Sequence, residues 1–308
     1  MSKTRPLRPL KGVRILSLAL NLPGPAALMR CRAMGATCVK IEPPAAKGAP
    51  RGSSGDPMGR YNPAAYKVLH DGVRVKAADL KTPAGQAVLQ RELAKADVLL
   101  TSFRPSALPK LGLAWKSLHA RYPSLCQIAI VGAHGDQAEA PGHDLTYLAE
   151  KGLVTSLEMP PTLYADMGGA QMATEAILQA ALYQRERYAG SGDIHPKGVF
   201  REVALSEAAA WAALPRRWGL TLPTGAVGGA HAGYRVYACR DGRVAVAALE
   251  PHFAAALCQA AGLGNSDMGA MFNPATREGI SRFLAGQTCT EIDRLARDKD
   301  LPLHTMKN

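Results

Sequence analysis

The chain has few aromatic residues, no long apolar run and no signal-peptide pattern. Phe, Trp and Tyr make up 6% of its 308 residues and do not alternate with basic residues, so a platform that stacks nucleic-acid bases is not expected. The longest apolar runs are much shorter than the roughly 20 residues of a membrane-spanning helix. The apolar run at 13–20 is too short for a signal peptide and is interrupted by Arg14. We therefore expect no nucleic-acid partner, no membrane association and a cytoplasmic location.

Metal and dinucleotide motifs are also missing from the sequence. The six cysteines form no C-x-x-C pair, and no set of Cys and His has zinc spacing, so reduced, buried thiols are expected and no metal or redox cofactor. The turn after the first expected strand has one glycine, Gly24, in place of G-x-G-x-x-G. Glu42 at the end of the second expected strand resembles a ribose-binding acid, but without the glycines dinucleotide binding is excluded.

The charge balance points to an anionic partner. Lys and Arg number 37 against 25 Asp and Glu, which gives a formal charge of +12. A phosphorylated small molecule fits this balance, because nucleic acid and membrane are disfavoured above. Apolar residues make up 47% of the chain, and 308 residues are enough for two globular domains.

The N-terminal part alternates strand and helix patterns. Gly12–Leu20 and Thr37–Ile41 read as strands around a turn at 21–25 and a helix at Ala26–Met34, which is a β-α-β unit with parallel strands. Further strands are expected at 97–102, 126–131 and 199–205, with loops at 45–60 and 189–198, a helix after Thr82 and a long helix at 170–187. The expected fold is α/β, with a Rossmann-like large domain over residues 1–205.

The C-terminal part predicts a smaller α+β domain. A helix and a linker are expected over residues 206–232. Two strands at 234–239 and 243–249 flank Arg240-Asp241-Gly242, which is a hairpin signal, and helices are expected at 251–261, 276–285 and 289–298. The small domain therefore covers residues 233–308.

Two acidic segments carry the candidate chemistry. His143 and Asp144 begin one apolar-patterned segment, and Asp166 precedes Gly168-Gly169 and the long helix. A histidine and a carboxylate can act as two proton carriers, and the N–H groups after Asp166 can meet developing negative charge. Taken alone, a His-Asp pair is more often a surface or capping pair. An Asp before a helix is usually just an N-cap. Lys40 is expected to be a plain surface or strand-end charge.

An ordered set of segments resembles the family III CoA-transferases, which include formyl-CoA transferase and α-methylacyl-CoA racemase. The matching segments are PLKGVRIL at 9–16, MGATCVKIEPP at 34–44, DLKTPAG at 79–85, ADVLLTSFRPSALPKLGL at 96–113, GHDLTYL at 142–148 and ADMGGA at 165–170. His143 stands where transferases of the family commonly have Tyr, and ALEPHF at 248–253 is similar to the racemase branch. The resemblance implies an interlocked homodimer whose sites combine the large domain of one chain with the small domain of the other.

The resemblance also implies site residues. His143 and Asp166 would be the two catalytic acid/bases, and Glu250 would support His143 across the dimer. The residues that would contact CoA are Ala78, Asp79, Leu80 and Lys81 near the adenine, Ser102, Phe103, Arg104 and Lys110 in the next segment, and Gly142, Asp144 and Tyr147 beside the pantetheine and thioester. Pro43 stands where racemases often have a phosphate-binding Arg, and the stretch between His143 and Asp166 is shorter than in racemases.

The expected function is epimerisation of a 2-methylacyl-CoA by two-base 1,1-proton transfer, with coenzyme A entering as part of the substrate. The alternative is CoA transfer between acids, with Asp166 attacking the thioester and carrying the acyl group as an anhydride. A third possibility is a CoA-binding member of the family that has lost turnover.

Overall fold

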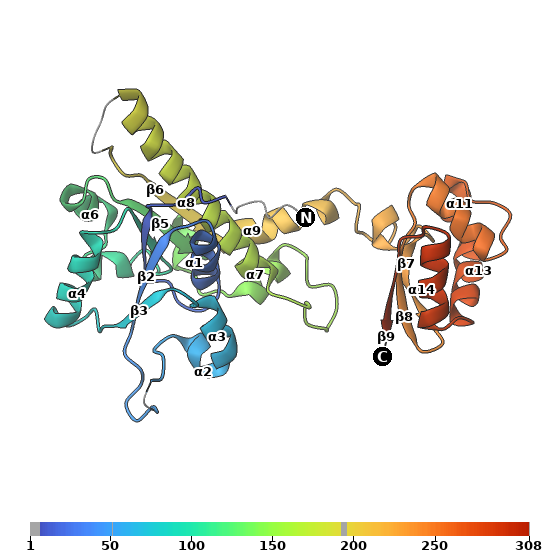
Figure 1. Ribbon diagram of the computed structural model, residues 1–308, viewed down its shortest axis with the longest axis horizontal. Coiled ribbons are helices and arrows are strands. Elements are labelled where there is room, and N and C mark those ends of the chain that lie inside the picture. The colour runs from blue at the N-terminus through green and yellow to red at the C-terminus, as the bar shows by residue number, and fades with distance from the viewer. Residues whose placement is uncertain (1–6, 51, 192–195, 308) are drawn as a thin grey trace. The chain divides into compact units, whose positions relative to one another are not determined.

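The chain forms two compact units. The computed structural model describes residues 7–50, 52–191 and 196–307 (Figure 1). The first unit ends at Ala212 and the second begins at Ala213, within the segment 206–232 expected as helix and linker. Each unit has its own sheet and its own apolar core.

The first unit is built on a parallel sheet of six strands in the order β3-β2-β1-β4-β5-β6. This is the strand order of a doubly wound nucleotide-binding fold, and the α/β class predicted from the sequence is confirmed. The central strands are buried apolar runs, as strands covered on both faces should be. The strands are β1 (Arg14–Ser17), β2 (Thr37–Glu42), β3 (Arg74–Ala77), β4 (Val98–Thr101), β5 (Cys126–Val131) and β6 (Phe200–Ala204).

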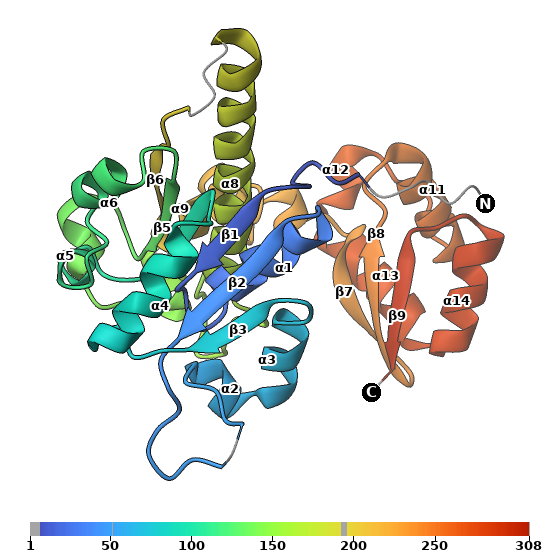
Figure 2. The ribbon, with the colours of Figure 1, turned by 60° about the vertical axis from the view of Figure 1, so that its left-hand side comes forward.

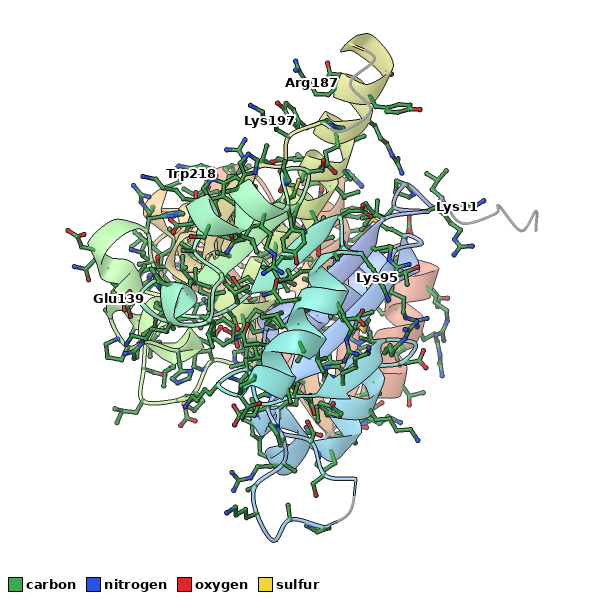
Figure 3. All side chains as sticks on the ribbon, turned by 90° about the vertical axis from the view of Figure 1, so that its left-hand side faces the viewer. Lys11, Lys95, Glu139, Arg187, Lys197 and Trp218 are labelled. Carbon is green, nitrogen blue, oxygen red and sulfur yellow. The ribbon has the colours of Figure 1, made fainter. Side chains whose placement is uncertain are left out.

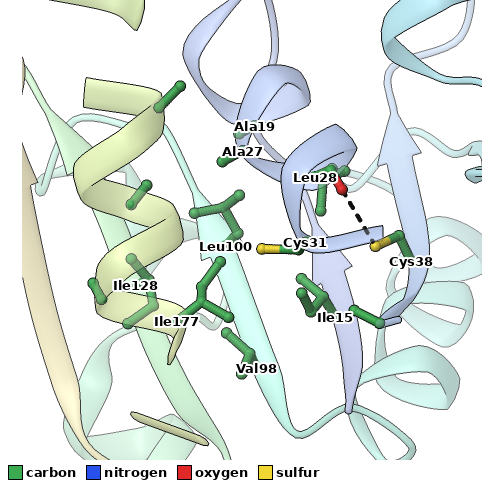
Figure 4. Close-up of a cluster of buried hydrophobic side chains, with 14 of the residues drawn as sticks. Ile15, Ala19, Ala27, Leu28, Cys31, Cys38, Val98, Leu100, Ile128 and Ile177 are labelled. Carbon is green, nitrogen blue, oxygen red and sulfur yellow. Dashed lines mark hydrogen bonds between the residues drawn. The ribbon is translucent and has the colours of Figure 1, made fainter. Parts of the chain in front are cut away.

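Helices cover both faces of this sheet (Figure 2). One face packs against α1 (Pro23–Ala33), α3 (Pro63–Leu69) and α8 (Tyr164–Ser191). The other face packs against α4 (Pro83–Leu93), α5 (Ala107–Lys110) and α6 (Trp115–Arg121). Figure 4 shows the first of these cores, where strand residues such as Ile15 and Ile128 meet Ala27 of α1 and Ile177 of α8.

Glycine allows two close approaches near the carboxyl ends of the strands. A Cβ on Gly24 would lie 2.2 Å from the Cβ of Ala19, so only glycine lets α1 start directly against the end of β1. A Cβ on Gly169 would lie 2.3 Å from Cδ2 of Leu205, at the crossing of α8 with α9 (Leu205–Ala212). Gly24 and Gly169 therefore have a packing role.

Three local predictions are wrong. Helix α1 begins at Pro23, inside the turn expected at 21–25, because a proline is favourable in the first turn of a helix. Helix α8 begins at Tyr164 and extends to Ser191, so it includes Asp166 and the start of the loop expected at 189–198; residues 192–195 of that loop lie outside the described residues. The loop expected at 45–60 ends early, at α2 (Pro57–Tyr61), whose N-cap is Asp56.

The second unit has an antiparallel sheet of three strands, β7 (Tyr234–Cys239), β8 (Gly242–Ala247) and β9 (Leu303–Lys307). The hairpin β7–β8 was predicted, whereas β9 was not. One face of the sheet packs against α11 (Pro251–Ala260), α13 (Pro274–Ala285) and α14 (Cys289–Asp298). The short elements are α10 (Leu214–Arg217), η2 (Ala226–Gly228) and α12 (Met268–Met271).

The excess basic charge is spread over the surface. Lys11, Lys95 and Lys197 are exposed and extend outward from different elements of the first unit (Figure 3). Within the described residues, none of the helices is long and apolar enough to cross a membrane.

Candidate active site

Two neighbouring pockets open at the carboxyl ends of the parallel strands. The first, here the His143 pocket, has a volume of about 300 Å³ and is lined by residues that follow β1, β4 and β5. The second, here the Lys81 pocket, has a volume of about 710 Å³ and is lined by residues that follow β2 and β3 and by α5. Leu20 and Phe103 line both pockets. The strand order reverses between β1 and β4, and this is where open α/β sheets bind ligands.

Most of the residues proposed from the sequence line one of these pockets. The His143 pocket is lined by Ser102, Phe103, Arg104, Gly142, His143, Tyr147 and Asp166. The Lys81 pocket is lined by Ala78, Asp79, Leu80, Lys81, Phe103 and Lys110, and also by Pro43. Asp144 is buried beside Asp166, and Glu250 belongs to the second unit. The fold thus gathers segments from residue 78 to residue 166 at one edge of the sheet.

His143 is the residue before α7 (Asp144–Glu150). Its backbone N–H donates to Thr146 Oγ1 at 3.0 Å, and the Thr146 hydroxyl donates to the His143 carbonyl at 2.8 Å. Gly142 allows this turn to lie against Tyr147, because a Cβ there would come within 2.5 Å of the tyrosine oxygen. The backbone is therefore fixed at the helix start, with the exposed imidazole at the edge of the pocket.

Asp166 lies in the first turn of α8 and is linked to α7 through Asp144. The Asp166 N–H donates to Asp144 Oδ1 at 2.9 Å, and Asp144 is only 5% exposed. Burial raises the pKa of Asp166 from 3.8 to about 6; the nearby Asp144 carboxylate adds to the rise, and His143 opposes it. A carboxyl group that titrates near neutral pH is suited to accept and return a proton.

The N–H groups after Asp166 do not have the role expected of them. The Met167 N–H donates to the Leu163 carbonyl at 3.0 Å, and Gly168 and Gly169 lie inside α8. Only the first residues of a helix leave N–H groups without an intrahelical partner, and α8 starts before Asp166. The prediction that these N–H groups donate hydrogen bonds to negative charge on a substrate is wrong, because they donate to carbonyl groups of α8 and of Leu163, which precedes it.

The expectation that Lys40 is a surface charge is also wrong. Lys40 is 0% exposed and pairs with Asp56 and Glu42, which are likewise buried. Glu42 lines the Lys81 pocket, and Asp56 binds the N–H of Asn21, which lines the His143 pocket. Sequence reasoning missed Asn21, although a polar residue between a buried strand and Pro-Gly-Pro was a usable signal.

One cluster in the second unit has the donor atoms of a metal site. Cys239, Asp241 and Cys289 place one ligand atom each within 4.8 Å of one another. Asp241 Oδ1 accepts the Cys289 N–H at 2.7 Å, and the two thiols are 3.6 Å apart. A helix cap and an S–H···S contact account for these groups.

Comparison with known proteins agrees with this arrangement. The model of CoA-transferase family III matches residues 10–308. The chain is 35% identical to succinyl-CoA–D-citramalate CoA-transferase of Chloroflexus aurantiacus over 67% of this chain and 53% of the relative. It is 30% identical to alpha-methylacyl-CoA racemase of Mus musculus over 86% of this chain and 68% of the relative. The chain thus spans about half to two thirds of the length of these relatives.

A solved structure has the same fold. The crystal structure of Rv3272 from Mycobacterium tuberculosis aligns with a TM-score of 0.76 and 23% identity, over 99% of this chain and 85% of the other. The family match, the fold and the position of the two pockets agree, and the chain belongs to CoA-transferase family III.

Proposed function

We propose that the protein epimerises the α-carbon of a 2-methylacyl-CoA thioester by two-base proton transfer. The observation that carries the proposal is that His143 and Asp166 line one pocket, with the pKa of Asp166 raised to about 6. Inversion through a planar enolate needs one base on each face of the α-carbon. A positioned acid/base contributes typically about 10²–10⁴-fold to the rate of such a transfer.

The Lys81 pocket supports CoA as the carrier of the acyl group. It adjoins the His143 pocket at Phe103, so a thioester in one pocket can continue into the other. Its apolar lining suits the adenine and pantetheine, and the ammonium groups of Lys81 and Lys110 suit the phosphates. Pro43 lines this pocket without offering a charge, so the two lysines carry the phosphate contacts in the proposal.

Glu250 would act in the proposed reaction only within a homodimer. It is the N-cap residue of α11 in the second unit, and in a dimer it would orient the His143 imidazole of the partner chain. The second unit offers a surface for such assembly, because Val236, on the sheet face away from the helices, is 57% exposed, and Trp218, which precedes the sheet, is 67% exposed. Light scattering of the purified protein tests the dimer.

The reaction is tested by hydrogen exchange. A single stereoisomer of 2-methylbutanoyl-CoA is incubated with the protein in D₂O, and mass spectrometry follows deuterium while chiral analysis follows inversion. We expect deuterium at the α-carbon and loss of stereochemical purity in the absence of any second acid. Asp166→Asn provides the matched control, because it keeps the side-chain volume and removes the base.

CoA transfer is the second candidate. Two observations favour it: the relative from Chloroflexus aurantiacus is a CoA-transferase, and the half-buried Asp166 carboxylate could attack a thioester. Turnover that requires a free carboxylic acid, together with hydroxylamine trapping of an acyl group on Asp166, would establish transfer in place of epimerisation. Binding of acyl-CoA with neither reaction would identify a non-catalytic member.

A further inference from the structure

Asn21 has a conformation that few residues other than glycine adopt. It lies between β1 and α1 with φ of +62°, and among the described residues the other non-glycine residue with positive φ is Asp300. Asparagine tolerates this conformation better than most residues, and non-glycine residues with positive φ are often found at functional sites. Asn21 lines the His143 pocket together with His143 and Asp166.

The buried carboxylate of Asp56 holds Asn21 in this conformation. Asp56 is 0% exposed, and its Oδ1 accepts the N–H of Asn21 at 3.1 Å and that of Met58 at 2.9 Å. Its Oδ2 pairs with the Lys40 ammonium. The backbone at the pocket is thus tied to a charge that lies wholly inside the protein.

Lys40 connects Asp56 to a second anchored carboxylate. The Lys40 ammonium also contacts His70 Nε2 at 2.9 Å and lies 3.4 Å from Glu42 Oε2. Glu42 accepts hydrogen bonds from Ser54 Oγ at 2.7 Å, from the Gly55 N–H at 3.2 Å and from the Tyr66 hydroxyl at 3.0 Å. These contacts form one cluster, which consists of Lys40, Glu42, Ser54, Gly55, Asp56, Tyr66 and His70.

A network in which each charged group has partners is rigid. His70 Nδ1 lies 2.7 Å from the Tyr66 carbonyl oxygen. This contact and the burial of His70 hold its imidazole ring in one orientation. A Cβ on Gly55 would lie 1.8 Å from the Pro43 carbonyl, so the segment that carries Asp56 fits tightly against the end of β2. Satisfied polar networks in a low-dielectric interior fix one arrangement of the groups attached to them.

The proposed reaction requires a hydrogen-bond donor that the earlier expectation did not supply. Removal of the α-proton and attack on the thioester both place negative charge on the thioester oxygen. Fixed donors at such an oxygen are among the largest contributions to catalysis. The N–H groups after Asp166 are bonded within α8, as described above.

We propose that the carboxamide of Asn21 donates a hydrogen bond to the thioester oxygen and that Asp56 is its positioning residue. This inference rests on the proposed action on an acyl-CoA thioester, and it holds for epimerisation and for transfer. A carboxamide offers N–H donors without a change of protonation. Its backbone N–H is held by a buried network, so the position from which the carboxamide extends is fixed before the substrate binds.

The first test replaces Asn21. Asn21→Asp tolerates the left-handed conformation and removes the donor, and Asn21→Gly keeps the loop free to adopt positive φ. Each should lower kcat by on the order of 100-fold, while the Kd of free CoA stays within about twofold. Asp300→Gly removes the other positive-φ side chain and should leave kcat unchanged. A kcat near the wild-type value in both Asn21 variants overturns the proposal.

Ser102 is the competing donor in the same pocket. Its Oγ accepts the Leu20 N–H at 3.2 Å, which leaves the hydroxyl hydrogen free to donate. Ser102→Ala should reduce kcat less than Asn21→Gly does. The opposite order would assign the thioester oxygen to Ser102 and overturn the role of Asn21.

A double-mutant cycle tests Asp56. Asp56→Ala should lower kcat through Asn21, so it should add little to the loss already present in Asn21→Gly. Asp56→Asn retains an Oδ1 acceptor for the Asn21 N–H and should recover part of the rate. Amide hydrogen exchange of wild-type Asn21 gives a readout that survives poor folding of the variants: we expect slow exchange, and fast exchange excludes the positioning role of Asp56.

An infrared measurement separates this inference from the proposed function. The carbonyl stretch of bound 2-methylbutanoyl-CoA should shift to lower frequency in the wild-type protein and should lose that shift in Asn21→Gly. A shift that is lost in the variant supports the donor even if the wild-type protein neither exchanges nor transfers. A shift that persists in Asn21→Gly excludes the donor even if the wild-type protein turns over.

Discussion

Asp144 offers a sharp test of how the pocket sets the proton affinity of Asp166. Asp144→Asn keeps an Oδ1 that accepts the Asp166 N–H, now bonded at 2.9 Å, and removes one negative charge. The backbone of α8 should therefore stay in place while the electrostatic field at Asp166 changes. The expected consequence is a lower pKa of Asp166.

The size of this change follows from the causes of the shift. The pKa of Asp166 is raised from 3.8 to about 6, with burial as the first cause and Asp144 as the second. Removing the second cause and retaining the first should leave the pKa between its ordinary value of 3.8 and the present value of about 6. Each pKa unit of decrease corresponds to about 1.4 kcal/mol of differential interaction between the two protonation states.

The assay is the pH dependence of kcat/KM in the direction in which Asp166 removes the proton. The rate should rise with pH through the pKa of Asp166, and this acidic limb should move to lower pH in Asp144→Asn. Glu150→Gln removes a charge from the exposed end of the same helix and is the matched control, with no shift expected. An acidic limb that stays in place in Asp144→Asn would refute the electrostatic role of Asp144.

Three further outcomes are expected. His143→Ala should slow exchange from one stereoisomer by on the order of 100-fold or more and from the other less, and equal, near-normal exchange of both isomers would remove His143 from the mechanism. Asp166→Asn should stabilise the fold at pH 8 but not at pH 4. The folded-state pKa of Asp166 is raised, so the wild-type protein loses up to about 3 kcal/mol of unfolding free energy as pH rises from 4 through 6. The variant has no carboxyl group at this position and does not lose this free energy. Urea unfolding at both pH values measures this, and equal differences would contradict it. Lys81→Ala and Lys110→Ala should each weaken CoA binding up to about fivefold at low salt, with no effect on an acyl-pantetheine that lacks the nucleotide; calorimetry at two salt concentrations decides.

Local patterns were sufficient for the central strands and for several helix starts. Cys126–Val131 is β5 as predicted, because a short apolar run with branched residues favours a buried strand. Thr82 accepts the Gly85 N–H at 3.1 Å and Pro83 begins α4, also as predicted, since both effects act within one helical turn.

Tertiary contacts decided the features that sequence reasoning missed. Lys40 looks like a strand-end charge in the sequence, but its partners Asp56 and His70 are 16 and 30 residues away along the chain. Strand β9 becomes a strand through its pairing with β8, from Gly242 opposite Lys307 to Val246 opposite Leu303. A pattern of neighbouring residues contains neither piece of information.

The sequence by itself determined the α/β class, most of the segments that line the two pockets, and the residue types available for proton transfer. Only the tertiary structure decided that Asp144 turns its carboxylate to Asp166, that Asp56 fixes Asn21, and that the N–H groups after Asp166 belong to a helix. The physical reason is range: helix caps and buried strands depend on residues within one turn or one strand, whereas the field and the hydrogen bonds at a site depend on groups that folding brings together from distant parts of the chain.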